Sequence, residues 1–549
     1  MQKYIIGIDT GGTYTDAALI DQTSGQVMAT AKEPTTHHQL ALGTGNALKK
    51  IIEDTGIKSE NIELIAVSST LATNSIIENK GARVAVIVIG YVKHFKLPVK
   101  AVTYVKGGHN IQGKEEEPLD IEYLVTLIEK LKNEVDAYGV CSAMSIKNPA
   151  HELVTEKAIS LIDPLKPVFC SHRISQLTGM QERAATAGLH AKLMPIMQKF
   201  VDGVTEAMSD QSITCPMIII GGNGKALAAE KVVEEAGLTV ASGPACTAFF
   251  GATHTRSDED SLVIDVGGTT TDIAMIEQGH PLLAGEGCQI GQWKTHIEAV
   301  NMRTEGIGGD SHVHLDDQGN LTIGPGRVTP LSMAENPGSP ADWLGAENCS
   351  RLIILRPGTH EDLPDNELCR LLKKTKYITP AAIRAETGLG GIALDVQLEH
   401  LTRNQHIFEC GFTPTDALHS LGLITIGKTS TASSGAEILG KTMGMTGAEF
   451  SKKVLIHTEE LIENLIIDYI VQRYWQKSLT NFISTRKNHP ILGVDFSLKV
   501  PLIGLGAAGR YFLPRVAEKL GTTVQFPQNC EVGNAVGAAI IGQSSIRSS

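Results

Sequence analysis

The sequence has no excess of basic residues. Its 549 residues include 48 lysines and arginines against 60 aspartates and glutamates, which gives a net charge of −12. A nucleic-acid or anionic-membrane surface needs a basic face, so this balance argues against both kinds of partner. It does not exclude phosphate as a ligand, because backbone N–H groups, a lysine or a metal ion can hold phosphate on an acidic protein.

Membrane-spanning runs, a signal peptide and paired cysteines are also missing from the sequence. No apolar run is long enough to cross a bilayer, and Met1–Ile5 lead into a strand rather than an apolar signal core. The nine cysteines are scattered and form no CxxC pair. An odd number of cysteines in a long chain argues against a disulfide framework. We therefore expect mostly buried free thiols in a cytoplasmic protein.

Strand-like and helix-like runs alternate along most of the chain, which predicts α/β layers with largely covered sheets. At about 100–200 residues per domain, a chain of this length predicts two to four domains. Strands are expected at 82–89, 135–143 and 217–220, and helices at 121–132 and 449–476, of which 449–476 is the longest helical candidate. Gly324–Pro340 is rich in glycine and proline and is expected to be a surface loop.

One stretch of sequence occurs twice. "GIDTGGTYTD" spans Gly7–Asp16, and "IDVGGTTTD" spans Ile264–Asp272. Each copy has an apolar run, an aspartate, a Gly-Gly-Thr turn, a threonine with a second aspartate, and another apolar run. Two apolar runs around a glycine-rich turn predict a β-hairpin. A hairpin needs glycine in its turn but does not need the flanking acids and hydroxyls, which point to a ligand.

The repeated residue types suit phosphate as that ligand. Glycines in a tight turn let backbone N–H groups approach an anion, and threonine hydroxyls add further donors. The carboxylates of Asp9 and Asp265 would repel phosphate unless a cation lies between, so we expect them to hold a hydrated Mg²⁺. The predicted phosphate-binding residues are Thr10, Gly11, Gly12, Thr13, Thr15, Gly267, Gly268, Thr269 and Thr271. This arrangement differs from the GxxxxGK[ST] loop, which the sequence lacks.

A glycine-rich segment near the C-terminus is the candidate site for a nucleoside. "VPLIGLGAAGRYFLPRVAEKLG", Val500–Gly521, reads as a strand, a turn with Gly504 and Gly506, and a helix. A Rossmann-type dinucleotide site is the alternative for this pattern. The small residues of "NCEVGNAVGAAI", Asn529–Ile540, allow close approach of a helix, either to a bound ligand or to a neighbouring sheet.

These motifs resemble those of the actin, sugar-kinase and Hsp70 ATPase superfamily, whose members carry two phosphate hairpins and an adenosine motif in this order. More narrowly, the chain resembles the hydantoinase A/5-oxoprolinase family along nearly its full length. Besides the two hairpins, the resembling blocks are "STLATNSIIENKGARVAVIV", "NPAHE", "QERAATAGLHAKLMP", "SGPA", "IGGDS" and "TPTDAL". The resemblance implies an α/β, two-lobed, actin-like ATPase fold of ribonuclease H-like type, with mixed sheets flanked by helices.

The resemblance also implies how the chain divides and which residues act. It predicts an N-terminal lobe at 1–255 with the first hairpin and a C-terminal lobe at 256–549 with the second, and the nucleotide in the cleft between them. Gly504, Gly506, Ala507 and Ala508 would lie against adenosine, and Gly308, Gly309 and Asp310 would form a loop near the nucleotide. Thr70, Thr73 and Asn74 are candidates for the cleft wall, and Asp9 and Asp265 would position Mg²⁺ or the attacking water.

The activity implied is ATP-dependent opening of a cyclic amide, of the hydantoin or 5-oxoproline type, through phosphorylation of the amide oxygen. The protein would mainly position the reactants and neutralise charge. Alternatives are the ATP-using subunit of an acetone- or acetophenone-type carboxylase, a small-molecule kinase, or a nucleotide-gated binding module. The expected partners are a small-molecule substrate and either further copies of the chain or a hydantoinase B-type subunit.

Acid–base groups are the last candidates. Asp16, Asp272 and Asp310 lie in or near the phosphate motifs, so each is a candidate acid or base, and the sequence does not rank them.

His312 and His314 are two residues apart, which would place them on one face of a strand and makes a metal site conceivable. A solvated loop is the expected conformation for "SHVHLDD".

Overall fold

The computed structural model describes residues 2–11, 14–35, 40–77, 80–90, 93–174, 176–285, 287–290, 292–316, 318–335, 337–345, 349–359, 363–375, 377–404, 406–475, 479–485 and 493–548. The chain forms two compact units. Unit 1 comprises 1–260, 274–302 and 531–549, and unit 2 comprises 261–273 and 303–530. The division into lobes near residue 255 stays a prediction.

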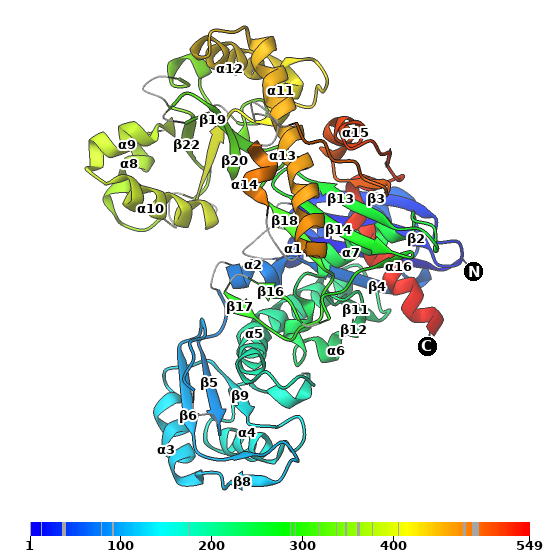
Figure 1. The fold of residues 1–549 in the computed structure, drawn as a ribbon, viewed down its shortest axis with the longest axis vertical. Helices are drawn as coiled ribbons and strands as arrows, with labels where there is room; N and C mark the ends of the chain where they lie inside the picture. The colour runs from blue at the N-terminus through cyan, green and yellow to red at the C-terminus, as the bar shows by residue number, and fades with distance from the viewer. Residues whose placement is uncertain are drawn as a thin grey trace. The chain divides into compact units, whose positions relative to one another are not determined.

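Unit 1 is built on a six-stranded mixed sheet with the order β12-β11-β4-β1-β2-β3. β1 and β2 are antiparallel, as are β2 and β3, whereas β4 runs parallel to β1 and β11 parallel to β4. The strands are β1 (Tyr4–Thr10), β2 (Tyr14–Asp21), β3 (Val27–Pro34), β4 (Ile62–Ser69), β11 (Met217–Ile220) and β12 (Ala226–Ala228). Three antiparallel strands followed by parallel additions form a ribonuclease H-like sheet, which confirms the predicted mixed α/β fold (Figure 1).

The small residues near the C-terminus pack a helix onto this sheet. α16 (Gly533–Ser548) lies so close to β1 that a Cβ on Gly7 would be 2.0 Å from the carbonyl oxygen of Ala535. A Cβ on Gly537 would likewise be 2.1 Å from the carbonyl oxygen of Cys246 in α7 (Ser242–Ala252). Of the two interpretations of these small residues, the structure shows helix packing against protein.

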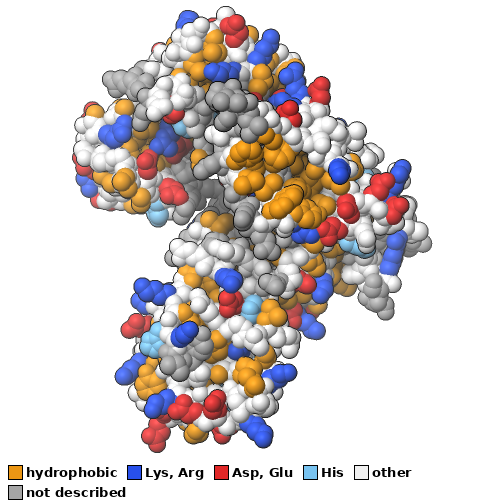
Figure 2. Space-filling view, viewed as in Figure 1, with side chains coloured by type: hydrophobic (Ala, Val, Ile, Leu, Met, Phe, Trp, Pro, Cys, Tyr) orange, Lys and Arg blue, Asp and Glu red, His pale blue; other side chains and the backbone are white. Residues whose placement is uncertain are grey.

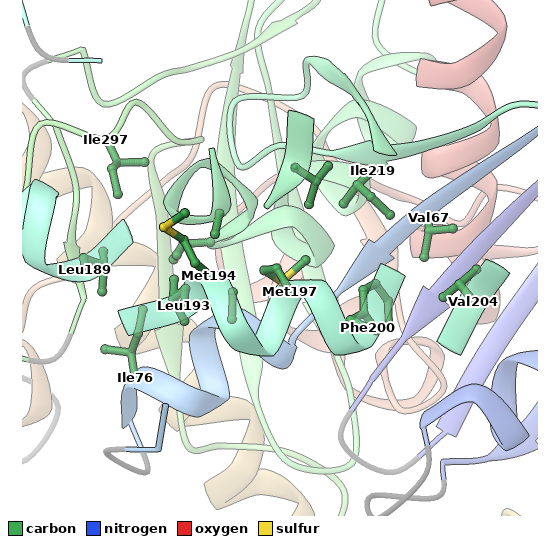
Figure 3. Close-up of a cluster of buried hydrophobic side chains, with 14 of the residues drawn as sticks. Val67, Ile76, Leu189, Leu193, Met194, Met197, Phe200, Val204, Ile219 and Ile297 are labelled. Atoms are coloured by element: carbon green, nitrogen blue, oxygen red, sulfur yellow. The ribbon is translucent and has the colours of Figure 1, made fainter. Parts of the chain in front are cut away.

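The rest of unit 1 surrounds α5 (Met180–Asp210), which lies against a four-stranded parallel sheet, β10-β9-β5-β6. Side chains of α5, among them Met197, Phe200 and Val204, share one buried cluster with Val67 of β4 and Ile219 of β11 (Figure 3). The other elements are β5 (Val84–Ile89), β6 (Ala101–Val105), β9 (Ala137–Ser142), β10 (Val168–Cys170), α1 (Leu40–Thr55), α2 (Leu71–Ile77), α3 (Ile121–Leu131), α4 (Ala150–Ile162) and α6 (Ala229–Val232). The strands expected near 82–89, 135–143 and 217–220 and the helix near 121–132 are confirmed.

Unit 2 contains the second predicted hairpin. β13 (Ser261–Val266) pairs in parallel with β25 (Leu502–Leu505), and β25 with β26 (Val524–Gln525). β14 (Thr271–Glu277) follows β13 and begins in this unit. Further elements are β19 (Ser311–Leu315), β20 (Leu321–Arg327), β21 (Thr329–Pro330), β22 (Arg351–Leu355), β23 (Tyr377–Ile378), β24 (Ile407–Gly411), α8 (Glu367–Lys374), α9 (Pro380–Thr387), α10 (Gly391–Arg403), α11 (Pro414–Ser420), α12 (Thr429–Thr442), α13 (Gly447–Trp475), α14 (Thr480–Thr485) and α15 (Gly509–Lys519).

Two expectations about single elements are wrong. α13 is the helix predicted at 449–476, but with 29 residues it is shorter than α5, which has 31. Pro195 interrupts the helical pattern of α5 in the sequence, yet the helix continues through it because most of its side chains are buried. The segment Gly324–Pro340 is not simply a surface loop, since β20 and β21 take up part of it and Leu331 is fully buried.

The cysteines and the helices agree with two expectations from the sequence, which argued against a disulfide framework and against membrane-spanning runs. All nine cysteines are free, and six of them are buried, which confirms the expected absence of a disulfide framework. Among the described residues, no helix combines the length and the apolar character that crossing a membrane requires.

Hydrophobic side chains do gather over α13 and α14 on the face seen in Figure 2. At the end of α13, Tyr474 and Trp475 are 57% and 65% exposed, so unit 2 presents aromatic surface to solvent.

Candidate phosphate sites and the family of the chain

The first hairpin carries a buried carboxylate at the end of β1. Asp9 is 4% exposed, and its two oxygens accept hydrogen bonds from the Ser68 hydroxyl at 2.6 Å and from the Asn534 side-chain amide at 3.2 Å. Burial raises the pKa of Asp9, while these two donors act against the rise. β4 and α16 thus hold Asp9 from both sides, because Ser68 lies near the end of β4 and Asn534 lies in the first turn of α16.

A second carboxylate stands opposite on β2. Asp16 faces Asp9 across the strand pair and accepts from the Lys32 ammonium of β3 at 2.7 Å and 2.9 Å. Burial raises the pKa of Asp16 to about 6, and Lys32 moderates the rise. A carboxyl group with such a pKa exchanges protons near neutrality, which fits the predicted acid–base role. That role stays a prediction.

The turn of the first hairpin lies beside a cavity. The Gly11 amide donates to the Tyr14 carbonyl oxygen at 3.0 Å, which closes the turn. Thr10 and Gly11 line a cavity of about 620 Å³, together with two of the predicted wall residues, Thr70 and Asn74. Thr73, the third, accepts from the Ala241 amide and does not line it. Gly12 and Thr13 lie outside the described residues.

The hydroxyls of the first hairpin differ in what they bind. The buried Thr15 hydroxyl is 3.1 Å from the Thr35 hydroxyl, so one of the two donates to the other. The Thr10 hydroxyl, in contrast, is buried and has no hydrogen-bond partner among the described residues. Phosphate contacts for both threonines stay predictions, and of the two hydroxyls only that of Thr10 has no hydrogen-bond partner among the described residues.

The second hairpin repeats the closing hydrogen bond of the first. The Gly267 amide donates to the Thr270 carbonyl oxygen at 2.9 Å, at positions equivalent to Gly11 and Tyr14. Asp265 is the second-last residue of β13, and the loop that follows β25 packs against its carboxylate. A Cβ on Gly506, where φ is +79°, would be 2.3 Å from an oxygen of Asp265 and 2.4 Å from the Val266 carbonyl oxygen.

The residues predicted to lie against adenosine therefore contact the hairpin itself. Besides Gly506, Ala508 donates its amide to the Val266 carbonyl oxygen at 3.1 Å, and Gly504 faces the ring of Phe526. Ala507 is the one of the four predicted residues whose side chain is exposed to solvent. A contact between adenosine and any of these four residues stays a prediction.

A loop of glycines wraps the second turn. The amides of Gly309 and Asp310 donate to the carbonyl oxygens of Gly267 and Gly268 at 3.0 Å and 2.7 Å. A Cβ on Gly308 would be 2.6 Å from the Gly268 carbonyl oxygen, so a larger residue has no room at this contact. The loop of Gly308, Gly309 and Asp310 thus lies against the second turn, and its position near a nucleotide stays a prediction.

The loop also places a carboxylate beside the turn. Asp310 pairs with Arg327 of β20 at 3.3 Å, and the Thr415 hydroxyl lies 3.4 Å from its other oxygen. Burial raises the pKa of Asp310, and Arg327 acts against the rise. A Cβ on Gly268 would be 2.7 Å from Asp310, so this acid lies directly against the turn.

Asp272 differs from the other acids, because one of its oxygens has no partner. Its Oδ1 is buried without a hydrogen bond from any described residue, and Thr270 lies 3.5 Å from its other oxygen. Burial raises the pKa of Asp272 to about 6.

The two predicted threonines of the second hairpin differ in their surroundings. The Thr271 hydroxyl donates to the Ile307 carbonyl oxygen at 2.7 Å and so contacts the neighbouring loop, whereas Thr269 is exposed.

Sequence reasoning did not give "TPTDAL" a role, and the structure does. Asp416 is fully buried at the start of α11, where it forms a capping box with Thr413 and accepts from the amides of Leu331 and Ser332 at 2.9 Å and 2.8 Å. The neighbouring Thr415 amide donates to the Gly309 carbonyl oxygen at 2.8 Å. The spacing from threonine to acid is the sequence signal of a capping box. Asp416 thereby fixes the loop that carries Asp310.

The two paired histidines do not lie in a solvated loop. His312 and His314 lie on β19 with stacked rings 4.9 Å apart, and His312 Nε2 is 3.0 Å from the Ser350 carbonyl oxygen. Burial lowers the pKa of His312 to about 4, so the ring stays neutral at pH 7. Asp316 accepts hydrogen bonds from the backbone amides of Gln318 and Asn320.

Family models and relatives agree with this architecture. The model described as "Hydantoinase/oxoprolinase N-terminal region" matches residues 5–162, and the model described as "Hydantoinase/oxoprolinase" matches residues 183–484. Caprolactamase subunit alpha of Pseudomonas jessenii is 26% identical over 370 residues, which cover 61% of this chain and 52% of that protein. Acetophenone carboxylase gamma subunit of Aromatoleum aromaticum is 26% identical over 364 residues, 58% of this chain and 49% of that protein.

Among solved structures, nucleotide-free acetone carboxylase has the same fold, with a TM-score of 0.67 at 16% identity over 98% of this chain and 70% of that one. The chain spans about half the length of the two curated relatives described above. The second family model alone covers more than half of the 549 residues. The chain belongs to the hydantoinase/oxoprolinase family.

Proposed function

We propose that this protein uses ATP to hydrolyse a cyclic amide, with the phosphate groups bound by its two glycine-threonine hairpins. The observation that carries the proposal is the repeated turn, closed by the same hydrogen bond in both copies and preceded each time by an aspartate, Asp9 or Asp265. Membership of the hydantoinase/oxoprolinase family and the likeness to a caprolactamase subunit support a cyclic amide as substrate.

The chemistry requires activation because an amide carbonyl is a poor electrophile. Transfer of the γ-phosphoryl group breaks its bond to ADP and forms a bond to the amide oxygen. Water then adds to the amide carbon, the ring C–N bond breaks with a proton passing to nitrogen, and a second water releases phosphate. The net reaction converts the cyclic amide, ATP and two waters into the opened amino acid, ADP and phosphate. Asp16, Asp272 and Asp310 are the proposed groups for moving protons.

Mg²⁺ would supply charge neutralisation at the phosphates. A carboxylate precedes each closed turn, Asp9 before the first and Asp265 before the second, and this pair fits a hydrated cation, since Mg²⁺ keeps several waters and takes one or two carboxylates. The oxygens of Asp9 already accept from Ser68 and Asn534, so Asp9 would bind waters of the ion rather than the ion itself. Asp9 and Asp265 are the proposed holders of this hydrated ion.

The proposal is tested by ATP hydrolysis in the presence of hydantoin, 5-oxoproline and caprolactam. We expect at least one cyclic amide to stimulate release of phosphate and to yield an equal amount of the opened amino acid. A stable phosphorylated product would instead identify a kinase, and no stimulation by any cyclic amide would contradict the proposal.

A carboxylase subunit is the second candidate, because acetophenone carboxylase gamma subunit is a relative of similar identity. Acetone and acetophenone with bicarbonate belong in the same panel, and bicarbonate-dependent ATP turnover would favour this function. Both relatives are subunits of larger enzymes, so the assays are run with and without the protein encoded beside this one. We propose that such a hydantoinase B-type subunit is required for full activity.

A further inference from the structure

Two sequence motifs that the proposed phosphate contacts do not use meet at the acid of the first hairpin. "SGPA", Ser242–Ala245, begins α7, and "GNAVGAA", 533–539, begins α16. A Cβ on Gly243 would be 3.4 Å from Oδ1 of Asp9, and Asn534 donates to the other oxygen of that carboxylate. Both motifs therefore bear on the surroundings of Asp9 within unit 1.

The backbones around this acid are packed without intervening side chains. A Cβ on Gly537 would be 2.1 Å from a backbone oxygen of α7, and one on Gly7 would be 2.0 Å from a backbone oxygen of α16. The Ser242 hydroxyl accepts from the Ser69 amide at 3.0 Å and donates to the Ser69 carbonyl oxygen at 2.8 Å. Close-packed backbones transmit shifts rather than absorb them, so β1, β4, α7 and α16 form one rigid frame.

A chain of hydrogen bonds runs through this frame to Asp9. The Thr247 hydroxyl of α7 donates to Oδ1 of Asn534, and Nδ2 of Asn534 donates to Oδ2 of Asp9 at 3.2 Å. The Ser68 hydroxyl donates to the other oxygen of Asp9 at 2.6 Å. Thr247 is 2% exposed, so water does not compete for its hydroxyl. Both oxygens of Asp9 are thus held by donors whose own positions are fixed.

The Asn534 amide can face Asp9 in two ways, and Thr247 distinguishes them. Toward an ionised carboxylate the amide must present its nitrogen, which leaves its oxygen to accept from Thr247. The Thr247 hydroxyl can instead donate to the Gly243 carbonyl oxygen, which lies 3.2 Å away. A reversed amide would then donate to Thr247 and present its oxygen to Asp9, an arrangement that needs a protonated carboxyl group. The orientation of the amide and the proton on Asp9 are therefore coupled.

We propose that Asn534 is a positioning residue for Asp9, and that the Thr247 hydroxyl sets the orientation of its amide. This inference rests on the proposed function, in which Asp9 binds waters of the Mg²⁺ ion. The amide holds the carboxylate ionised and fixes the direction of its oxygens. Thr247 acts on Asp9 only through Asn534, so its loss should be felt at the acid without any direct contact.

Three further titratable groups surround Asp9. Asp16 faces it from β2, Lys32 acts on it from β3, and the Cys246 thiol acts from α7. Burial and then the charge of Asp9 raise the pKa of Cys246, so this thiol stays neutral. Burial raises the pKa of Asp9, and the hydrogen bond from Asn534 acts against the rise. Loss of this donor should therefore raise the pKa of Asp9 further.

The test measures ATP turnover against pH in variants of the two residues. We expect Asn534→Ala to lower turnover about tenfold at pH 6 and less than about threefold at pH 9, where Asp9 ionises without help. Thr247→Val keeps the side-chain shape but removes the hydroxyl, and should lower turnover about threefold at pH 6 and leave it unchanged at pH 9. Thr247→Ser restores the hydroxyl and should follow the wild-type profile.

Thr155→Val is the matched control. Thr155 is a fully buried threonine of α4, and its hydroxyl donates to the carbonyl oxygen four residues earlier at 2.8 Å, as that of Thr247 can. We expect its pH profile to have the wild-type shape. A loss of turnover in Asn534→Ala that is equal at every pH would overturn the proposal, and so would a Thr247→Val profile that matches that of Thr155→Val.

Thermal unfolding without nucleotide separates this inference from the proposed function. Above its ordinary pKa and below its raised one, Asp9 keeps a proton only in the folded chain, so its contribution to stability falls as pH rises through this window. Asn534→Ala extends the window upward, so the deficit in melting temperature should grow from pH 5 to pH 8. The comparison is made in an Asp16→Asn background, which removes the other acid of the hairpin.

The two measurements give distinct outcomes. If no cyclic amide stimulates ATP hydrolysis but the deficit of Asn534→Ala grows with pH, the proposed function fails and the positioning role stands. A deficit that is the same at every pH would overturn the positioning role, since Asn534 would then serve only the packing of α16.

Discussion

The two hairpins share a sequence and a closing hydrogen bond, but their surroundings differ. At the first turn, Thr10 leaves a buried hydroxyl unpaired beside a cavity. At the second, Val266 occupies the equivalent position, and its carbonyl oxygen accepts from the Ala508 amide. The loop at 308–310 packs against the second turn, whereas Thr10 and Gly11 of the first hairpin line a cavity. The repeat therefore forms the same closing hydrogen bond in two different surroundings.

The acids of the two hairpins show the same difference. Asp16 has a cation, Lys32, at hydrogen-bond distance, whereas Asp272 has a buried oxygen without a partner among the described residues. Burial raises the pKa of each to about 6. A fixed counter-charge stabilises the ionised form of Asp16, whereas no such cation among the described residues is paired with Asp272, so the two proposed proton-transfer groups should respond differently to substitution. Variants at equivalent positions can separate these roles.

The largest effect is expected from the aspartates that precede the turns. Asp9→Asn and Asp265→Asn should each lower ATP turnover by about 10³-fold or more, because each removes a charge that the bound ion and water require. Phosphate release measures the loss, and circular dichroism checks that the variants fold. Wild-type turnover in both variants would show that the hairpins do not bind the reacting phosphates.

The next largest effect should fall on only one hairpin. At Gly506 an added Cβ would meet Asp265 and Val266 within 2.4 Å, and φ is +79°, whereas at Gly243 it would lie 3.4 Å from Asp9, an ordinary contact. Gly506→Ala should therefore cost about 1–2 kcal/mol in backbone strain and displace Asp265. We expect turnover to fall at least tenfold in Gly506→Ala and less than twofold in the matched variant Gly243→Ala. Equal losses of turnover in the two variants would contradict the inference that Asp265 is packed tightly against Gly506 while Asp9 has room beside Gly243.

The sequence predicted the hairpins well because their signals are local. Apolar runs around Gly-Gly-Thr define two strands and a turn, and these residues form them. The resemblance also led to the glycine loop at 308–310, which does lie against the second turn. These features depend on residues close together in the chain or on motifs that keep their order.

What lies against each hairpin depends on residues far apart in the chain, which the sequence did not reveal. Asn534 reaches Asp9 because α16 returns to β1, and Lys32 reaches Asp16 through the register of β2 and β3. The buried role of Asp416 was also missed, because its capping box reads as an ordinary helix start. Long-range packing decides these contacts, and periodicity carries no information about it.

A smaller effect is expected in the stability of Asp272→Asn. Below pH 3.8 the carboxyl group is protonated in both the folded and the unfolded chain, and between 3.8 and about 6 only the folded chain keeps the proton. The wild-type contribution to stability from this group therefore falls as pH rises through this window. Asparagine cannot ionise, so the variant should gain thermal stability relative to wild type between pH 4 and 7. A constant difference in melting temperature would show that Asp272 has an ordinary pKa.

The smallest effect concerns the cation of the first hairpin. Lys32→Met removes the charge that moderates the pKa of Asp16, so that pKa should rise further, and the effect should be small because Lys32 is half-exposed and screened by solvent. The window in which stability falls with pH should then extend above 6 in this variant. Melting temperatures from pH 4 to 8 measure the shift, and Lys157→Gln serves as the control for loss of a distant charge. An unchanged window in Lys32→Met would mean that Lys32 does not tune Asp16, and the two hairpin acids would then differ only in the vacant oxygen of Asp272.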